Sequence, residues 1–322
     1  MTRRGILLFA GLGLAWGIPY LFIKIAVGEL EPAMVVLSRA GLAAILLMPL
    51  ALFRREVGPV LRRWRPMLVY TVVEIILPWY FLSTAEERLP SSTAGLLLAA
   101  VPLAGVAVAF AMGRPERLSG LNWAGIAIGM LGVAALVGLD VGGSDLIAVA
   151  QMAVVVVGYA LGPAVLARWM SDLPGIGVVA VSLVGTAVAY VPFVLLTGAW
   201  PPAWPSGQAI LAIVVLAVVC SALAFVLMVS LVSEIGPVKA TAITYVNPAV
   251  AIIAGVLVLG EQVTVWTIVG FVLVLGGSYF VTRRPRPRPG DARTASDSAA
   301  SMPTVASAEG PDEAPAVETR RP

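Results

Sequence analysis

The chain contains no histidine and only one cysteine, and charged residues make up only 12% of its 322 residues. The lack of histidine removes the commonest general base and metal ligand. The single cysteine, Cys220, cannot build a disulfide framework or a thiolate zinc site, and its place in an apolar run is typical of a small buried filler. We therefore expect no bound metal and no cofactor.

The scarcity of charge also excludes an ordinary soluble domain. Such domains carry about 25% charged residues, whereas this chain is 59% hydrophobic and has a mean hydropathy of +0.96. That much apolar surface needs a lipid bilayer around it. The formal net charge of +3 does not indicate nucleic-acid binding, because the arginines lie in short segments between apolar runs.

Long apolar runs are the most abundant feature. A helix needs about 20 apolar residues to cross the hydrocarbon core of a bilayer, and the chain predicts an all-α membrane protein with ten transmembrane helices. The predicted spans lie near residues 5–27, 32–53, 66–86, 91–112, 119–139, 147–169, 175–197, 207–231, 237–258 and 263–282. The first run could instead be a signal peptide, but no small-residue cleavage site follows it, so we interpret it as a retained helix.

Loop charges predict the orientation of these spans. The segments on the side of the N-terminus hold fifteen cations before the distal tail: Arg3, Arg4, Arg54, Arg55, Arg62, Arg63, Arg65, Arg114, Arg117, Arg168, Lys239, Arg283, Arg284, Arg286 and Arg288. The opposite segments hold only Lys24 and Arg88. Because positive loops remain in the cytoplasm, both termini are expected there.

Two stretches of the chain resemble each other about 145 residues apart. The matched pairs are Pro102 and Pro248, Glu116 and Glu261, Gly125 and Gly270, Gly132 and Gly277, Gly41 and Gly185, and Pro49 and Pro192. We predict two repeats, residues 1–140 and 141–282, each with five spans, so that the second is inverted relative to the first. Residues 283–322, rich in Arg, Pro, Ala and Ser, are expected to form a disordered cytoplasmic tail.

Several short motifs occur in a familiar order. They are Ala15-Trp16-Gly17 followed by Lys24, Pro32 followed by Arg39, the prolines Pro102 and Pro248, and Leu259-Gly260-Glu261 before the last span. The set resembles the EamA family of the drug/metabolite transporter superfamily over roughly residues 5–282. The first half departs from this pattern. Arg114 and Pro115 separate Gly113 from Glu116, whereas Gly260 and Glu261 are adjacent. The resemblance implies a central cavity lined by helices 1, 3, 4, 6, 8 and 9, and a small metabolite that many members export.

Three charges within the spans are candidate functional groups. Glu74, the only acidic residue we place inside a span, lies roughly 12 Å from the cytoplasmic edge, and Arg39 roughly 10 Å from the outer edge. Intramembrane charges are costly, so Glu74 is a candidate proton-coupling group whose neutral form burial favours. We hypothesise that Glu74 pairs with Arg39. For Arg39 we favour a structural role over a functional one. Lys24 can meet a substrate carboxylate or snorkel to the interface.

Aromatic and amide side chains complete the predicted site. Trp16 lies near the middle of its span, and Tyr159 is its repeat counterpart, so both are candidates for a site between the halves, although structural filling is an equal alternative. The predicted substrate-binding set is Trp16, Tyr20, Lys24, Glu74, Trp79, Tyr159, Tyr245 and Asn247. Pro102 and Pro248 are predicted to be structural, and Asn247 with Pro248 to form a polar helix break.

Together these features predict a secondary transporter in the cell membrane rather than an enzyme. Its expected partners are a small-molecule solute such as an amino acid, a proton and the lipid bilayer, with no nucleic acid, as a monomer or homodimer. No nucleotide-binding Gly-Lys-Ser/Thr motif is present to drive it by ATP. The alternative is a membrane-embedded enzyme acting on a lipid-linked substrate, which would need clustered acids, bases or metal ligands near one membrane face.

Overall fold

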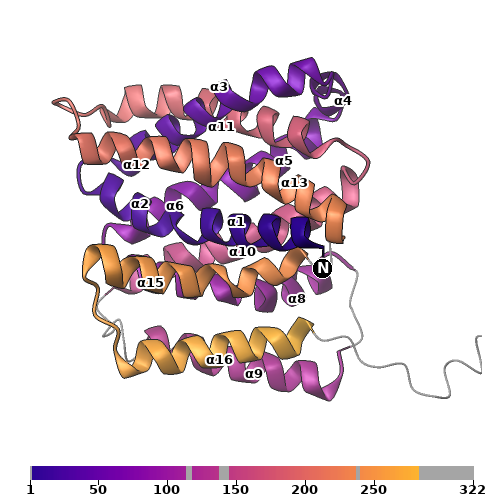
Figure 1. Ribbon diagram of the computed structural model, residues 1–322, viewed down its shortest axis with the longest axis vertical. Coiled ribbons are helices and arrows are strands. Elements are labelled where there is room, and N and C mark those ends of the chain that lie inside the picture. The colour runs from indigo at the N-terminus through magenta and orange to yellow at the C-terminus, as the bar shows by residue number, and fades with distance from the viewer. Residues whose placement is uncertain (1, 114–117, 138–144, 237–239, 283–322) are drawn as a thin grey trace, which may run out of the picture. The chain divides into compact units, whose positions relative to one another are not determined.

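The computed structural model describes residues 2–113, 118–137, 145–236 and 240–282, and within these ranges it contains helices and no strand. The helices run back and forth between two ends, where the connecting loops gather (Figure 1). The predicted all-α membrane fold is therefore confirmed.

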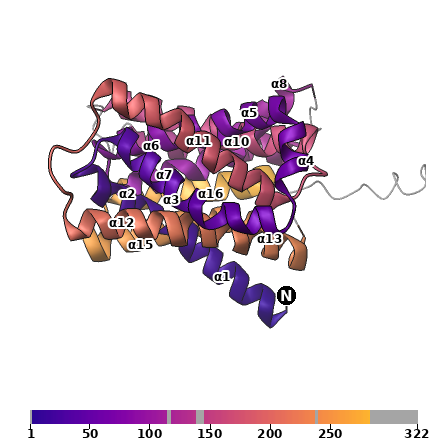
Figure 2. The same cartoon turned by 90° about the horizontal axis from the view of Figure 1, so that it is seen from above.

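The helices of the first half follow the predicted spans. They are α1 (Arg3–Gly17) with α2 (Pro19–Val27), α3 (Pro32–Phe53), a short connecting α4 (Val57–Arg62), α5 (Trp64–Thr71) with η1 (Val72–Ile76) and α6 (Leu77–Glu86), α7 (Ser91–Leu97) with η2 (Leu98–Ala100) and α8 (Val101–Ala111), and α9 (Gly120–Ala135). The first span bends at Ile18 and Pro19, between α1 and α2. On the N-terminal side of this bend, α1 runs obliquely to its neighbours (Figure 2).

The second half has the corresponding helices in the same order. They are α10 (Leu146–Trp169), α11 (Gly175–Thr197), α12 (Gly207–Ala217) with η4 (Val218–Leu223) and α13 (Ala224–Ile235), η5 (Thr241–Tyr245) with α15 (Asn247–Leu259), and α16 (Val265–Thr282).

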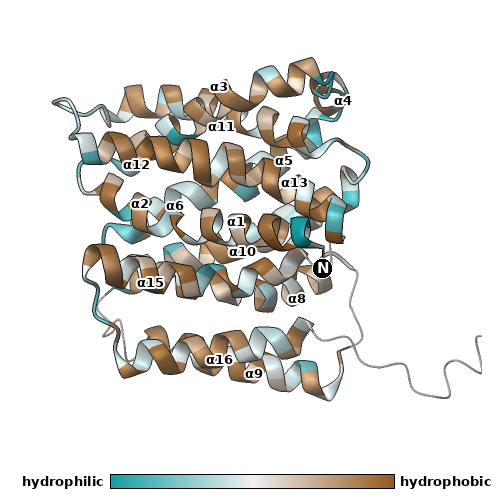
Figure 3. Ribbon diagram, in the orientation of Figure 1, coloured by the Kyte–Doolittle hydropathy of each residue, from teal (hydrophilic) through white to brown (hydrophobic). Residues whose placement is uncertain are grey.

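Nine helical stretches among the described residues are long and apolar enough to cross a membrane. The remaining predicted span, 119–139, corresponds to α9, a shorter apolar helix of 16 residues, and this span continues beyond the described part of the chain at residue 138. The residues along the helices are mostly apolar, and polar residues gather toward the two ends (Figure 3). Side chains such as Leu7, Phe53 and Leu196 are more than 70% exposed, as expected for contact with lipid.

The spans are not regular α-helices throughout, and the irregular segments recur in the two halves. A π-helical segment interrupts the third span at η1, and another interrupts the corresponding later span at η4. Short 3₁₀ segments, η2 and η5, precede the prolines Pro102 and Pro248, which lie in the first turns of α8 and α15. A proline is tolerated in a first turn because its missing N–H has no intrahelical partner there.

Neighbouring helices provide hydrogen bonds at these irregular segments. The Tyr190 hydroxyl of α11 donates to the carbonyl of Ile76 in η1 at 2.9 Å, and the Ser278 hydroxyl of α16 donates to the carbonyl of Ala99 in η2 at 2.8 Å. A bilayer offers no water for such groups, so a broken helix is tolerated only where protein supplies the partner.

Glycines bring α9 and α16 into close contact. A Cβ atom on Gly277 would lie 2.5 Å from the carbonyl oxygen of Gly125, and one on Gly270 would lie 3.2 Å from the carbonyl oxygen of Gly132. The sequence repeat pairs Gly125 with Gly270 and Gly132 with Gly277. In the structure Gly277 lies against Gly125, the counterpart of Gly270, and Gly270 lies against Gly132, the counterpart of Gly277. Such a crosswise arrangement is what a two-fold relation between the helices requires.

This interface yields a stability prediction. We expect Gly277→Ala to destabilise the protein by about 1–3 kcal/mol, because the new methyl group would meet backbone atoms of Gly125 and Gly129 that cannot rotate away. The measurement is thermal unfolding of the purified protein in detergent. Gly276→Ala is the matched control, since a Cβ at Gly276 meets nothing within 4 Å. Equal melting temperatures for the two variants would contradict the close approach.

Candidate functional site

Arg39 of α3 lies at the centre of a polar group buried among the spans. Its side chain is only 7% exposed, and its Nε donates to the Ser221 hydroxyl of η4 at 2.9 Å. Its guanidinium carbon lies 3.8 Å from the ring centroid of Trp79 in α6, close enough for a cation–π interaction. Helix α3 therefore contributes a charge to the interior, although we expected Arg39 to be structural.

Two tyrosines complete this group. Tyr20 of α2 is buried, and both Tyr20 and Tyr159 of α10 lie within electrostatic reach of Arg39. The Trp79 side chain lies within electrostatic reach of the Tyr159 hydroxyl. We call Arg39, Trp79, Ser221, Tyr20 and Tyr159 the arginine cluster. It draws on α2, α3, α6, α10 and η4, and so on both halves of the chain.

The hypothesised pair between Arg39 and Glu74 does not form in this structure. Three ion pairs join described residues, and these are Arg4 with Glu234, Arg54 with Glu56 and Arg63 with Asp172. Glu74 lies in η1 with its carboxyl group against Gly162 of α10, and its buried Oε2 has no hydrogen-bond partner. The rise per residue fixes the depth of a side chain but not its direction around the helix, and the π-helical η1 alters that direction.

Lys24 binds backbone carbonyl oxygens, a contact that neither of its two predicted roles included. Its Nζ donates to the carbonyl oxygens of Glu86 at 2.5 Å and Leu89 at 3.0 Å, at the C-terminal end of α6. Helix C-termini favour a cation because their last carbonyls lack intrahelical partners. Lys24 thus links α2 to the end of α6.

Glu86 is the residue that sequence reasoning missed. No sequence-based prediction named it, but the structure buries Glu86 completely, and neither of its carboxyl oxygens has a hydrogen-bond partner. Glu87 points outward, where partial burial and the nearby Glu31 raise its pKa. The one signal in the sequence was that Glu86 is the last residue of the predicted span 66–86.

The other predicted site residues lie in different surroundings. Trp16 packs edge-on against Phe225 of α13, with the ring centroids 6.0 Å apart. The Tyr245 hydroxyl donates to the carbonyl of Ser278 and contacts the Thr282 hydroxyl, near the C-terminal end of α16. Asn247 begins α15 beside Pro248, directly after the 3₁₀ segment η5, and its buried Oδ1 has no partner. A 3₁₀ segment therefore precedes α15 at Asn247 and Pro248, and Tyr245 binds the end of α16.

Three carboxylates cap the N-termini of helices that are distant in sequence. Glu261 accepts hydrogen bonds from the Ser91 and Ser92 amides at 2.7 and 3.0 Å, where α7 begins. Glu56 accepts from the Gly177 amide in α11 at 2.7 Å. Glu29 accepts from the Ser206 amide at 2.7 Å, before α12. The first amides of a helix have no intrahelical acceptor and attract negative charge, so these contacts join the loops firmly to the bundle.

Hydrogen bonding changes the acidity of two of these caps. The Ser206 hydroxyl and amide lower the pKa of Glu29. Partial burial alone would raise the pKa of Glu261, but the hydrogen bonds from Ser92 and Ser91 together lower it below its ordinary value of 4.5. Glu116, the predicted counterpart of Glu261, lies outside the described residues.

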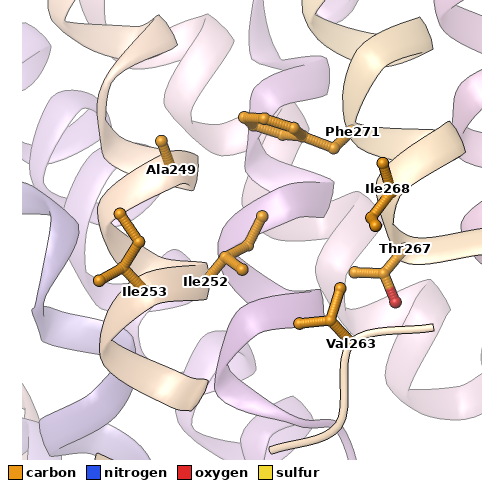
Figure 4. Close-up of a pocket in the computed structure, with 7 residues that line it drawn as sticks. All are labelled: Ala249, Ile252, Ile253, Val263, Thr267, Ile268 and Phe271. Atoms are coloured by element: carbon orange, nitrogen blue, oxygen red, sulfur yellow. The ribbon is translucent and has the colours of Figure 1, made fainter. Parts of the chain in front are cut away.

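Two cavities are lined by residues outside the arginine cluster. One of about 240 Å³ lies between α15 and α16, where Ile252, Ile253, Ile268 and Phe271 line it (Figure 4). Its apolar walls suit a hydrocarbon group better than a polar metabolite. The other, of about 210 Å³, lies near Glu31 and Tyr80. No group of three potential metal-ligating side chains occurs among the described residues.

The fold and its buried polar interior define a multi-pass α-helical membrane protein. The chain belongs to the EamA-like transporter family, whose model matches it twice, over residues 3–138 and 146–283.

Relatives match over most of their length. The chain is 30% identical over 291 residues to the uncharacterized inner membrane transporter YedA of Escherichia coli K12, which covers 86% of this chain and 92% of the relative. It is 24% identical over 290 residues to an uncharacterized transporter of Archaeoglobus fulgidus, covering 88% of this chain and 99% of that one.

A solved crystal structure shares the fold. The superposition has a TM-score of 0.63 at 21% sequence identity and covers 88% of this chain and 98% of the other. At this identity the likeness concerns the fold alone.

The carboxylate caps give a pH prediction. Because the pKa of Glu261 is lowered on folding, its contribution to stability is complete above 4.5 and disappears as the pH falls through the lowered value. We expect Glu261→Gln to lose about 1–2 kcal/mol at neutral pH, and to lose less further stability than wild type when acidified.

The measurement is the melting temperature in detergent between neutral and acidic pH. Glu31→Gln is the control, because Glu31 also precedes a helix but its side chain makes no capping hydrogen bond. Parallel pH curves for wild type and Glu261→Gln would contradict the prediction.

Proposed function

We propose that the protein is a secondary transporter of the cell membrane that moves a small metabolite, of the amino-acid type, by alternating access between two inverted five-helix repeats. The repeats are residues 1–140 and 141–282, and the predicted tail, residues 283–322, lies outside the described residues. The observation that carries the proposal is the arginine cluster, a buried charged and aromatic group within the spans to which both halves contribute. Intramembrane charges facing the bundle interior mark substrate pathways.

Three features support the inverted repeats. The glycines of α9 and α16 meet crosswise, and the π and 3₁₀ segments recur at similar places in the two halves. The family model also matches each half separately. An odd number of spans per repeat requires the second repeat to be inverted.

The distribution of charge supports cytoplasmic termini. Arg3 and Arg4 lie at one end of the bundle, which is also where α3 ends and α5 begins, near Arg54 and Arg63 (Figure 1). The opposite end holds the loops of Glu29, Glu31, Glu87 and Glu261. Under the positive-inside rule the arginine-rich end is cytoplasmic.

The arginine cluster suits a ligand with an anionic group and an apolar portion. Among the described residues no carboxylate lies within ion-pair distance of Arg39. Its side chain contacts the Ser221 hydroxyl and the Trp79 ring, and Glu86 acts on its charge without forming an ion pair. A buried charge needs a counter-charge, and a substrate carboxylate would supply one. The aromatic rings would contact the remainder of the substrate.

An enzyme acting on a lipid-linked substrate finds less support. Such an enzyme would need a nucleophile with a base, or metal ligands, near a membrane face. The chain has no histidine, and the buried carboxyls Glu74 and Glu86 are twelve residues apart on one span, Glu74 near its middle and Glu86 at its end. Relatives named as inner membrane transporters favour transport instead.

The test is counterflow in liposomes that contain the purified protein, with a panel of amino acids and related metabolites. We expect wild type to exchange at least one solute, and Glu74→Gln to exchange it while losing accumulation driven by a pH gradient, because Glu74 is the predicted proton-coupling group. If wild type exchanges no solute of the panel, the transport proposal fails. If Glu74→Gln accumulates solute as wild type does, Glu74 is structural.

A second experiment tests the role of Arg39. We expect Arg39→Gln to raise the half-saturating concentration of a carboxylate solute about 10- to 100-fold, since a hydrogen bond to a charged group contributes about 1.5–3 kcal/mol. The carboxamide analogue of the same solute should change much less. Arg65→Gln is the matched control, because Arg65 also lies over a tryptophan ring but is exposed. Equal losses for the acid and the amide would indicate a structural role.

A further inference from the structure

Glu86 is a buried acid that the proposed function does not yet use. It is the last residue of α6, its side chain is 0% exposed, and both carboxyl oxygens lack a hydrogen-bond partner. The neighbouring acids Glu87 and Glu261 differ from Glu86 in exposure and in hydrogen bonding. Glu87 is exposed, and Glu261 receives two amide hydrogen bonds at the start of α7.

The surroundings of Glu86 leave both of its charge states accessible. A carboxylate without donors is costly to bury, which favours the neutral acid. Lys24 on α2 and Arg39 on α3 attract the negative form, and Glu261, before α16, repels it. Tyr20 on α2 and Tyr159 on α10 also face this region. The ammonium of Lys24 is held by two carbonyls, so it forms no close ion pair with the Glu86 carboxyl.

The position of Glu86 relative to Glu74 is also informative. The two acids lie on the same span, twelve residues and therefore about 18 Å apart along its axis. Tyr159 lies within electrostatic reach of both carboxyls and of Arg39. The arginine cluster thus lies between one unpartnered acid toward the cytoplasmic end and a second toward the outer end.

We propose that Glu86 is a second proton-binding site, at the outer end of the path, and that it takes up a proton when an anionic substrate occupies Arg39. An anion at Arg39 reduces the positive potential that stabilises the Glu86 carboxylate, so a proton from the outer solution binds to it. Linkage requires the converse, so a protonated Glu86 strengthens anion binding. Anion and proton would then move together. The linkage rests on the proposed transport of an anionic solute, whereas proton binding by Glu86 does not.

Infrared spectroscopy of the protein in lipid nanodiscs tests proton binding without any substrate. A protonated carboxylic acid has a C=O stretch that is separate from the amide bands and shifts in deuterated water. We expect this band to appear as the pH falls and to lose about half of its amplitude in Glu86→Gln, because Glu74 supplies the rest. Glu87→Gln, which changes the adjacent exposed acid, should leave the buried component unchanged.

A second substitution keeps the test decisive if Glu86→Gln does not fold. Glu86→Asp retains a carboxyl group, and we expect it to shift the frequency or the pH midpoint of the same band, which Glu87→Asp should not. If neither Glu86 variant alters the band at any pH between acidic and alkaline conditions, Glu86 does not bind a proton there and the proposal is overturned.

The linkage is tested by adding a solute that wild type exchanges in counterflow. With a carboxylate solute we expect the pH midpoint of the Glu86 band to rise by about one unit, which corresponds to tenfold coupling. Arg39→Gln should abolish that rise while retaining the band. An unchanged midpoint in wild type would refute the linkage. A protein that exchanges no solute would refute the transport proposal and leave the infrared result to decide proton binding.

Discussion

The bilayer offers no hydrogen-bonding partner to the backbone, and the rest of the structure depends on this constraint. It explains why carboxylates from distant loops cap α7, α11 and α12, and why the ammonium of Lys24 binds the last carbonyls of α6. Each contact satisfies a helix end and at the same time joins two spans. Ends that are fixed in this way define how far a helix can tilt.

The same constraint places the polar interior at the irregular segments. A π-helical turn has i→i+5 hydrogen bonds and shifts the direction of the side chains that follow. η1 carries Glu74, and η4 carries Ser221, whose hydroxyl donates to the carbonyl of Leu216 and accepts the hydrogen bond of Arg39. Each of the two π-helical segments therefore holds one functional candidate.

Much of the fold was predictable from the sequence, because apolar run length and helix-ending residues are local properties. The predicted spans 32–53 and 175–197 match α3 and α11 at both ends. The interior was less predictable. The depth of Arg39 and Glu74 did not reveal their directions, and the position of Glu86 at the end of a span did not reveal that neighbouring helices bury it. Tyr245 was predicted to bind substrate, but its hydroxyl contacts Ser278 and Thr282 of α16, which the sequence does not reveal.

The helices of the two halves follow the same order, but the charged residues within them differ. Lys24, Arg39, Glu74 and Glu86 all belong to the first half, and the position that corresponds to Arg39 at the offset of Gly41 and Gly185 is the buried Leu183. Close packing constrains the glycines and helix breaks of both halves alike. A buried charge needs a partner at one place only, so it need not recur in the other half. If an alternating-access path runs between the halves, its chemistry is then concentrated on the first one. The second half supplies Tyr159 and Ser221, which are neutral, so a proton or anion bound within the cluster changes the charge of one half only.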